Sequence, residues 1–409
     1  MPSTLAWLSH SETERQRALD ALELFQHKGA RDELGIGQIR DAFSELLFPG
    51  TSTVQTRAGY FLFVPWIYLD LERRKIRSAH IGERARRAEV RLVNALARSD
   101  DPEGTIGIDA RGSLKRLPSA VYWGGLGTWG IRRFRGHRGQ YHRSLDSYYR
   151  SLDRFGRSEI EESEELAPRN WHAGVPSPPK SFPDHASFSL RAQDAAYLQE
   201  RIFLTDRSSL LAYLVEEPGH PTMTRFPWEH PVLARVPERV RRTVDHARNF
   251  SEVIHGAPLL YNLMMAETAS ARGLQSEERV EDFRDRLAGW IERVSSRLRQ
   301  LRDWDRRELW AVLQEAPGNV PPPTHRFVTE WLDLVLKAPG PARIRESPRA
   351  RDLISHREQV LKRSRARLHH PRALELWGGD SGSGQLDYRW PVVREIVRDI
   401  VDGLARGDK

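Results

Sequence analysis

The sequence contains no cysteine in its 409 residues. Disulfides, thiolate nucleophiles and zinc or iron–sulfur sites with cysteine ligands are therefore excluded. No apolar run approaches the roughly 18–20 residues that a helix needs to cross a bilayer, which excludes a transmembrane helix. The start, MPSTLAWLSHSETERQRALD, lacks the basic region, apolar core and cleavage site of a signal peptide. We expect a cytoplasmic protein of bacterial type that does not contact membranes.

The common catalytic motifs are also missing. The chain has no H-E-x-x-H, no G-x-S-x-G, no phosphate-binding P-loop and no H-x-K pair. His137 and His142 have no carboxylate cluster nearby to complete a metal site, and His369 and His370 are adjacent, which is poor geometry for chelating one ion. The sequence thus predicts no catalytic residue, no metal and no cofactor, and favours a protein that is not an enzyme.

The charge is strongly basic, with a formal net charge of +8 and a pI near 9.8. A basic balance favours association with polyanions, of which nucleic acid is the commonest. A coding bias that places arginine where another genome would place lysine explains the total equally well. The distribution of the arginines is therefore more informative than their number.

Helical periodicity runs through most of the chain. Ser11 and Glu14 form a capping box, and Ile36, Ile39 and Phe43 begin the apolar stripe of a second helix. The short stretch TIGIDARGSLKRL has β character instead. We predict a mainly α, multi-domain helical protein with a helix-turn-helix-like or winged N-terminal part and short β elements.

Composition changes divide the chain into four consecutive segments. An acidic run followed by a proline-rich stretch is typical of a linker, and a Gly/Ser loop precedes the last helix. The predicted segments are a helix-turn-helix-like domain over 1–158 that ends in a basic, aromatic segment, a linker over 159–188, a central helical domain over 189–339, and a basic C-terminal segment over 340–409.

The stretch FPGTSTVQTRAGYFLFVPW, residues 48–66, predicts a helix that begins near Ser52 and is capped by Gln55. A helix N-terminus with exposed hydroxyls suits a phosphate, so Ser52 and Thr53 are candidate phosphate contacts. Gln55 and Arg57 follow in the first turns and are candidates for base edges or backbone. The alternative is that Ser52 and Gln55 only cap each other, while Arg57 is solvated or paired with an acid.

The window from Thr128 to Arg157 is the most biased part of the chain. It holds eight arginines and two histidines against two aspartates, interleaved with aromatic residues. Basic groups neutralise phosphates and aromatic rings stack on bases, which favours nucleic-acid binding. An intramolecular clamp on the acidic stretch 159–165 explains the same pattern. The candidate binding residues here are Arg132, Arg133, Arg135, Arg138, Tyr141 and Arg143.

A second basic segment, RIRESPRARDLISHREQVLKRSRARLHHP, lies near the C-terminus. Its helical spacing widens a charged surface that also suits a phosphate backbone. The candidate binding residues here are Lys362, Arg363, Arg365 and Arg367.

Four stretches together resemble a known bacterial family: LAWLSHSETERQRALDALELF, RDELGIGQIRDAFSELLFPGTSTVQTRAGYFLFVPWIY, LPSAVYWGGLGTWGIRRF and RARLHHPRALELWGG with LDYRWP. The family has a domain of unknown function, and its members lie in anti-phage defence islands beside a large helicase-type protein, as in the system called Azaca. The resemblance implies a role in antiviral defence with a helicase-type partner, but brings no active site. Gly124, Gly125 and Gly127 depart from the bulkier polar residues that the resemblance leads us to expect.

Three functions are compatible with these patterns. The first is a non-enzymatic, nucleic-acid-binding accessory component of a defence complex, with DNA as the expected ligand. The second is a protein–protein adaptor that docks a helicase through tryptophan-rich helices and the proline-rich stretch. The third is a metal-dependent nuclease with an unrecognised site.

Overall fold

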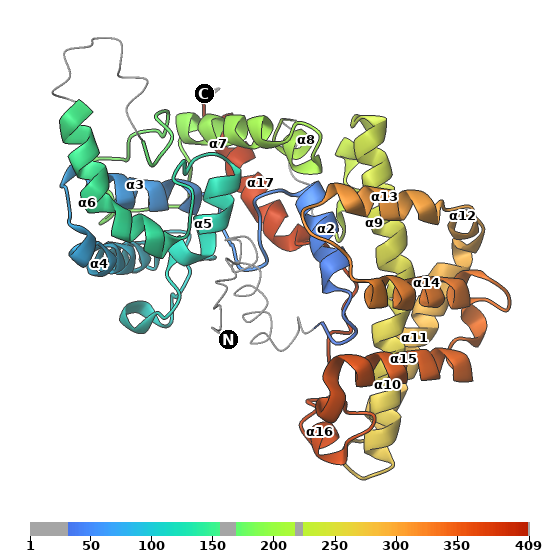
Figure 1. Cartoon of the computed structure of the whole chain (residues 1–409). Helices are drawn as coiled ribbons and strands as arrows, with labels where there is room; N and C mark the ends of the chain where they lie inside the picture. The colour runs from blue at the N-terminus through green and yellow to red at the C-terminus, as the bar shows by residue number, and fades with distance from the viewer. Residues whose placement is uncertain (1–31, 156–168, 217–223, 408–409) are drawn as a thin grey trace, which may run out of the picture. The chain divides into compact units, whose positions relative to one another are not determined.

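The computed structural model describes residues 32–155, 169–216 and 224–407, and these residues form helices and loops (Figure 1). Over these ranges the β pairing is limited to an isolated antiparallel bridge between Arg132 and Trp171. The mainly helical class is therefore confirmed. The short β elements and the helix-turn-helix-like or winged part are not confirmed: the stretch TIGIDARGSLKRL forms turns and a 3₁₀ helix, η1 (Arg111–Ser113).

The chain divides into two compact units, each assembled from separate stretches. Unit 1 comprises Met1–Leu46 with Arg241–Tyr388, and unit 2 comprises Leu47–Val240 with Arg389–Lys409. The four consecutive segments expected from composition stay a prediction. The capping box at Ser11 and Glu14 lies outside the described residues.

Unit 2 is built around the apolar helix α3, in which every residue from Tyr60 to Tyr68 is buried. The helix continues through Pro65. The helices of unit 2 are α3 (Tyr60–Arg73), α4 (Ser78–Leu96), α5 (Pro118–Thr128), α6 (Arg138–Phe155), α7 (Ala192–Thr205), α8 (Leu210–Glu216) and α17 (Trp390–Ala405), with the 3₁₀ helices η1, η2 (Pro227–Glu229) and η3 (Pro231–Ala234).

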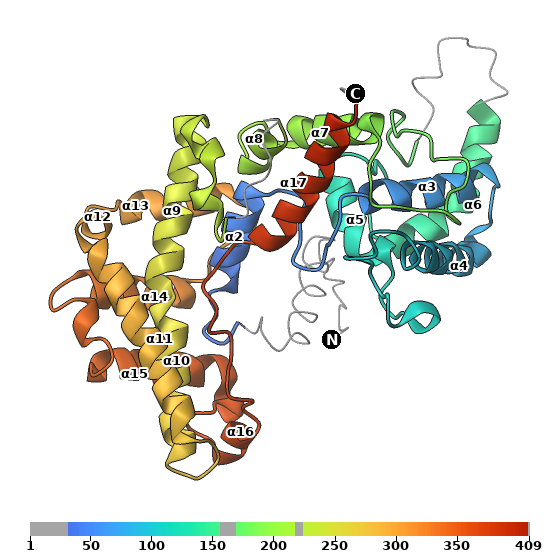
Figure 2. The same ribbon diagram turned by 180° about the vertical axis from the view of Figure 1, so that it is seen from behind.

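The last helix, α17, returns to unit 2 and packs against α7 and α8 (Figure 2). Its buried residues recur at helical spacing, from Trp390 through Val393, Ile396 and Ile400. Pro391 lies in its first turn, because proline's fixed φ suits that position.

The proline-rich stretch after residue 169 packs on α3. The Trp66 indole N–H donates to the Pro176 carbonyl at 2.6 Å, and the Phe182 ring lies 5.1 Å from the Trp66 ring. This part of the predicted linker therefore contributes to the core of unit 2.

Unit 1 is centred on α10, which is buried on almost all sides. Gly256 at its start allows close approach, because a Cβ there would lie 2.3 Å from the Trp290 ring. The helices of unit 1 are α2 (Gly37–Leu47), α9 (Glu238–Ile254), α10 (Gly256–Ser270), α11 (Glu277–Ser296), α12 (Leu298–Arg302), α13 (Arg306–Glu315), α14 (Pro322–Leu336), α15 (Pro348–Lys362) and α16 (Pro371–Glu375), with the 3₁₀ helices η4 (Pro341–Arg343) and η5 (Arg363–Arg365).

The tryptophans are mostly core residues. Among the described ones, only Trp310 is more than marginally exposed, and the rest are buried. Their indole N–H groups are often satisfied by backbone carbonyls, as for Trp290 on Glu252 and Trp331 on Val253. No helix within the described ranges is both apolar enough and long enough to cross a membrane.

Candidate nucleic-acid interface

Helix α6 carries the centre of the basic window and has two distinct faces. Tyr141, Leu145 and Tyr149, at intervals of four, are buried. Helix α4 packs beside α6 (Figure 1). Because residues four apart share one side of a helix, this burial turns the opposite side of α6 to solvent.

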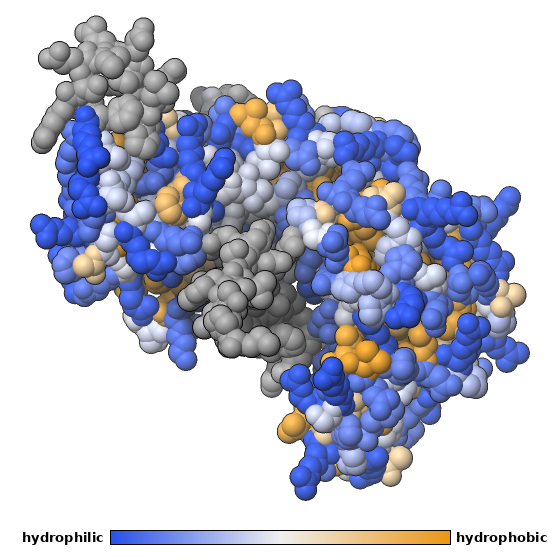
Figure 3. Space-filling view, in the orientation of Figure 1, coloured by the Kyte–Doolittle hydropathy of each residue, from blue (hydrophilic) through white to orange (hydrophobic). Residues whose placement is uncertain are grey.

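The solvent side of α6 is a row of polar and cationic residues. Gln140, Arg143, Ser147, Arg150 and Arg154 follow one another at intervals of three or four and are all exposed. On the face seen in Figure 3, the surface over α6 and α4 is mainly hydrophilic. From Arg143 to Arg154 the row covers about 16 Å at the rise of an α-helix. The sequence-based candidates included Arg143 but missed Arg150 and Arg154, although the spacing from Arg143 was a signal that could have found them.

The acidic residues of α6 engage the start of α4 and the turn that precedes it. The Asp146 carboxylate accepts a hydrogen bond from the Ser78 backbone N–H at 3.0 Å, and Asp153 pairs with Lys75 at 2.7 Å. Arg143, Arg150 and Arg154 have no carboxylate within ion-pair distance among the described residues. Among the described residues, therefore, no acidic side chain neutralises the positive charge of these three arginines.

Arg133 and Arg135, in the loop before α6, are exposed in the same way. The Arg133 backbone N–H donates to the Asn170 carbonyl at 2.8 Å, which fixes the loop while leaving the guanidinium outside. The acidic stretch 159–165, the partner in the predicted clamp, lies outside the described residues, and the clamp stays a prediction.

Tyr141 lies in the core instead of at a stacking surface. It is fully buried among other rings, with centroids 5.4 Å from Tyr68 and 5.9 Å from Trp171. Its hydroxyl donates to the Glu72 carboxylate at 2.5 Å, and burial raises the pKa of Glu72. A base cannot stack on this ring in the observed packing.

Arg132 and Arg138 also turn inward. The Arg132 guanidinium donates to the carbonyls of Trp123 and Gly136, and lies 4.9 Å from the centroid of the Trp123 ring. Arg138 donates to the Ser119 hydroxyl at 2.6 Å, and that hydroxyl donates to the buried Glu89. Both arginines therefore hold the loop and α5 in place.

His142 on α6 contributes no positive charge at neutral pH. Burial, and then the charges of Arg138 and Arg143, lower the pKa of His142 to about 4. The ring stays neutral and shares a hydrogen bond of 3.1 Å with the Tyr68 hydroxyl. The charge of this surface thus comes from arginine.

The stretch at residues 48–66 does not offer a helix N-terminus at Ser52. Residues 51–59 form turns, and α3 begins at Tyr60. The Gln55 side chain is buried; it accepts from the Ser52 N–H at 3.0 Å and donates to the Gly50 carbonyl at 3.3 Å. Ser52 and Gln55 thus cap each other, as the alternative interpretation held, but they do so in a turn and not at the start of a helix. Of the four candidate residues in this stretch, only Thr53 is exposed.

Arg57 is a buried ion-pair residue. Its guanidinium donates to the Asp399 carboxylate at 2.8–3.0 Å and to Asp101 at 2.7 Å. Burial alone would lower the pKa of Arg57, but the hydrogen bonds to Asp399 and Asp101 outweigh it and raise that pKa. The structure therefore supports the paired alternative and leaves the Arg57 side chain buried.

The second basic segment divides in the same manner. Lys362 pairs with Glu33 and, at 3.2 Å, with the buried Glu358, and Arg367 pairs with Glu33 at 3.1 Å. Arg363 and Arg365, in η5, are exposed. Half of these candidates therefore stabilise unit 1, and half remain accessible.

No group of three or more His, Asp or Glu side chains in the described part of the chain is arranged to hold a metal ion. The exposed arginines of α6 and its preceding loop are thus the strongest candidate site in unit 2, and what such a surface can do is bind an anion.

Residues 2–403 match the model of a family of unknown function, DUF6361, and the chain belongs to that family. No curated protein and no solved structure matches the chain. Family membership therefore assigns no activity to any of the residues described above.

Proposed function

We propose that this protein is a non-enzymatic, nucleic-acid-binding accessory component that contacts phosphates through the outer face of α6. The observation that carries the proposal is the row Arg143, Arg150 and Arg154, exposed on one side of an 18-residue helix. Arg133 and Arg135 extend the cationic surface beyond its first turn. DNA is the expected ligand.

The mode of binding follows from what is exposed. Guanidinium groups neutralise phosphates and release counterions, so affinity depends steeply on salt. Among the aromatic residues of the window from Thr128 to Arg157, Trp129, Tyr141 and Tyr149 belong to the core. Since contacts to phosphates carry no sequence information directly, we propose that the protein binds the sugar–phosphate backbone of the nucleic acid with little preference for particular bases.

The setting is a further part of the proposal. The resemblance to a defence-island family supports a cytoplasmic role in a bacterial anti-phage defence complex, with a helicase-type protein as partner. A protein that binds DNA without cutting it would hold the DNA in place for the helicase-type partner. A helix-turn-helix-like contact by the N-terminal part belongs to the same proposal.

Fluorescence anisotropy with a labelled DNA duplex tests the proposal. In the variant Arg143→Gln/Arg150→Gln/Arg154→Gln, we expect affinity at about 50 mM salt to fall at least tenfold. The control is Arg272→Gln/Arg293→Gln/Arg299→Gln, which removes three exposed arginines of unit 1 and should change affinity less than twofold. Equal losses in both variants, or no binding by the unmodified protein, would contradict the proposal.

The adaptor function is the second candidate, and one observation favours it. Leu376, just after α16, is 84% exposed, and Val360 on α15 is 51% exposed. Exposed apolar side chains of this size suit a protein partner. Co-purification with the helicase-type protein that survives high salt and nuclease, and that Leu376→Ser abolishes, would favour the adaptor over the nucleic-acid binder. Divalent-metal-dependent cleavage would favour the nuclease.

A further inference from the structure

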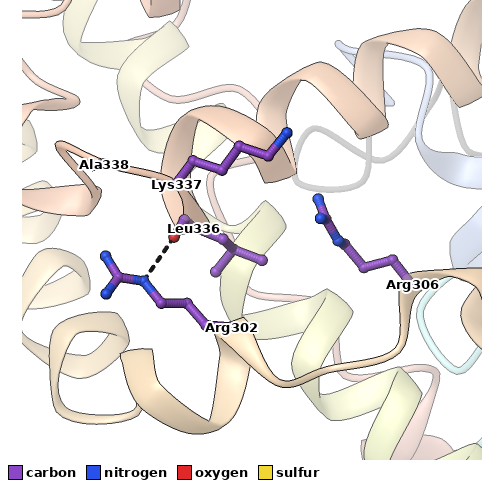
Figure 4. Close-up of a pocket in the computed structure, with 5 residues that line it drawn as sticks. All are labelled: Arg302, Arg306, Leu336, Lys337 and Ala338. Carbon is purple, nitrogen blue, oxygen red and sulfur yellow. Dashed lines mark hydrogen bonds between the residues drawn. The ribbon is translucent and has the colours of Figure 1, made fainter.

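A groove in unit 1 runs between α13 and α14. Two adjoining cavities of about 310 and 570 Å³ share Arg306 and Lys337 in their linings. One cavity extends to Arg302 at the end of α12 (Figure 4), and the other to Trp310 and His325. The groove is thus cationic at one end and aromatic at the other.

The register of the two helices explains this polarity. On α14, His325, Thr329 and Asp333 succeed one another at intervals of four, and Lys337 follows directly after the helix ends at Leu336; all four residues line the groove. On α13, Arg306 and Trp310 are four residues apart and face this row. Residues four apart lie on one side of a helix, so both helices contribute continuous rows.

The cationic end centres on one carboxylate shared by two cations. Asp333 accepts from Arg306 at 2.5 Å and from Lys337 at 2.8 Å. Figure 4 shows the Arg306 and Lys337 side chains leading toward each other, while Arg302 turns to the Leu336 carbonyl at 2.9 Å. The groove's charged residues are four cations, Arg302, Arg306, Arg307 and Lys337, and two acids, Asp305 and Asp333, which leaves a formal charge of +2. That excess suits a phosphate.

The aromatic end is a pair of rings at the surface. Trp310 and His325 lie with centroids 3.9 Å apart and planes tilted by 33°, and His325 is exposed. Such rings are stacking partners for a planar base. Between the two ends, the Thr329 hydroxyl is buried without a hydrogen-bond partner in the described structure. A buried hydroxyl normally has a partner, and a sugar hydroxyl would supply one.

We propose that this groove binds a nucleotide, with its phosphate at Arg306 and Lys337 and its base against Trp310 and His325. Arg306 and Trp310 are one helical turn apart, about 6 Å of rise, a gap that a pentose can bridge. The site lies wholly in unit 1, whereas the proposed nucleic-acid contact is the α6 face in unit 2. Either proposal can therefore fail while the other stands.

Isothermal titration calorimetry with AMP, adenosine and inorganic phosphate tests the site. We expect AMP to bind at least tenfold more tightly than either fragment. Arg306→Gln/Lys337→Gln should weaken AMP at least tenfold, and His325→Ala, a change at an exposed side chain, should weaken AMP but leave phosphate unchanged. The control Arg326→Gln, on α14 but outside the lining, should bind AMP as the unmodified protein does.

A 5′-phosphorylated single-stranded oligonucleotide distinguishes the two sources of such a ligand. Displacement of AMP by this strand, but not by its unphosphorylated form, assigns the groove to the end of a strand; failure of both strands to displace AMP assigns it to a free nucleotide. Absence of AMP binding, or equal binding of AMP and phosphate with no effect of His325→Ala, would overturn the proposal. Thermal unfolding of each variant confirms that unit 1 is folded.

Discussion

At the scale of single residues, the structure separates arginines that bind the protein itself from arginines that face solvent. Arg57 is the clearest example of the first kind, since its side chain is 7% exposed and that of its partner Asp399 only 4%. Removing one partner of a buried pair leaves the other charge uncompensated.

Arg57→Ala is therefore expected to destabilise the protein by about 3–5 kcal/mol. Urea unfolding followed by circular dichroism measures this change. DNA affinity of the folded fraction should stay within twofold, because the Arg57 side chain is buried. A variant of full stability and reduced DNA affinity would restore Arg57 as a contact residue.

His142 gives a prediction for pH. Its pKa in the folded protein is about 4, whereas an unfolded histidine titrates near 6.5. Between these values the unfolded state binds the proton and the folded state does not, so stability falls as pH drops from 6.5 to 4. His142→Gln should reduce the difference in unfolding free energy between pH 7 and pH 4.5. An unchanged difference would show that the ring is already charged in the folded state.

At the scale of elements, one face of α6 is buried in the core, and the opposite face carries the arginines for which we propose DNA binding. Leu145 is fully buried, so Leu145→Ala should cost about 2–5 kcal/mol because it leaves a cavity in the core. Arg150→Gln on the outer face should change stability by less than about 0.5 kcal/mol while weakening DNA binding. Urea unfolding and anisotropy on both variants check the separation, and a loss of stability in Arg150→Gln would contradict it.

Helix α5 offers a matched pair of glycines. A Cβ on Gly125 would lie 2.3 Å from the Gly50 carbonyl oxygen, whereas a Cβ on Gly124 would meet nothing within 4 Å. Gly125→Ala should therefore destabilise by about 1–3 kcal/mol, and Gly124→Ala should stabilise by up to about 1 kcal/mol because alanine favours helix. Thermal unfolding distinguishes them, and equal effects would mean that α5 does not pack this closely. The glycines that departed from the family resemblance thus have unequal roles.

From periodicity in the sequence, the existence of a helix was predicted more reliably than the residue at which the helix begins. The apolar stripe of Ile36, Ile39 and Phe43 correctly predicted the helix that forms α2, in which Ile39 and Phe43 are buried. The helix expected at Ser52 begins at Tyr60, because Gln55 closes a local turn that has the same sequence pattern as a helix cap. A local sequence pattern does not distinguish a turn closed by a side chain from the capped start of a helix.

The sequence predicted which segment carries the candidate site, but not which of its side chains face solvent and which face the core. The window around residue 140 was identified from its arginines, yet Arg132 and Arg138 bind carbonyl and hydroxyl groups within unit 2, and Tyr141 donates to Glu72. Those partners lie up to 69 residues away in the chain, beyond the range of spacing arguments.

At the scale of the whole molecule, each unit combines stretches from distant parts of the chain. Asp399 on α17 holds Arg57 across 342 residues, and Glu33 pairs with Lys362 and Arg367. Composition changes along the sequence cannot reveal such pairings. A chain that ends at Tyr388 should consequently lack the packing of α17 on α7 and show a markedly lower melting temperature, and an unchanged melting temperature would contradict the role of α17 in unit 2.

The central claim is that the α6 arginines bind a phosphate backbone, and the salt dependence of DNA binding tests it most directly. On duplex DNA, the slope of log Kobs against log salt decreases in magnitude by about 0.9 for each phosphate that the protein no longer neutralises. For Arg143→Gln/Arg150→Gln/Arg154→Gln we predict a slope smaller in magnitude by about 2 to 3 than that of the unmodified protein. A slope that stays the same in this variant would contradict the claim.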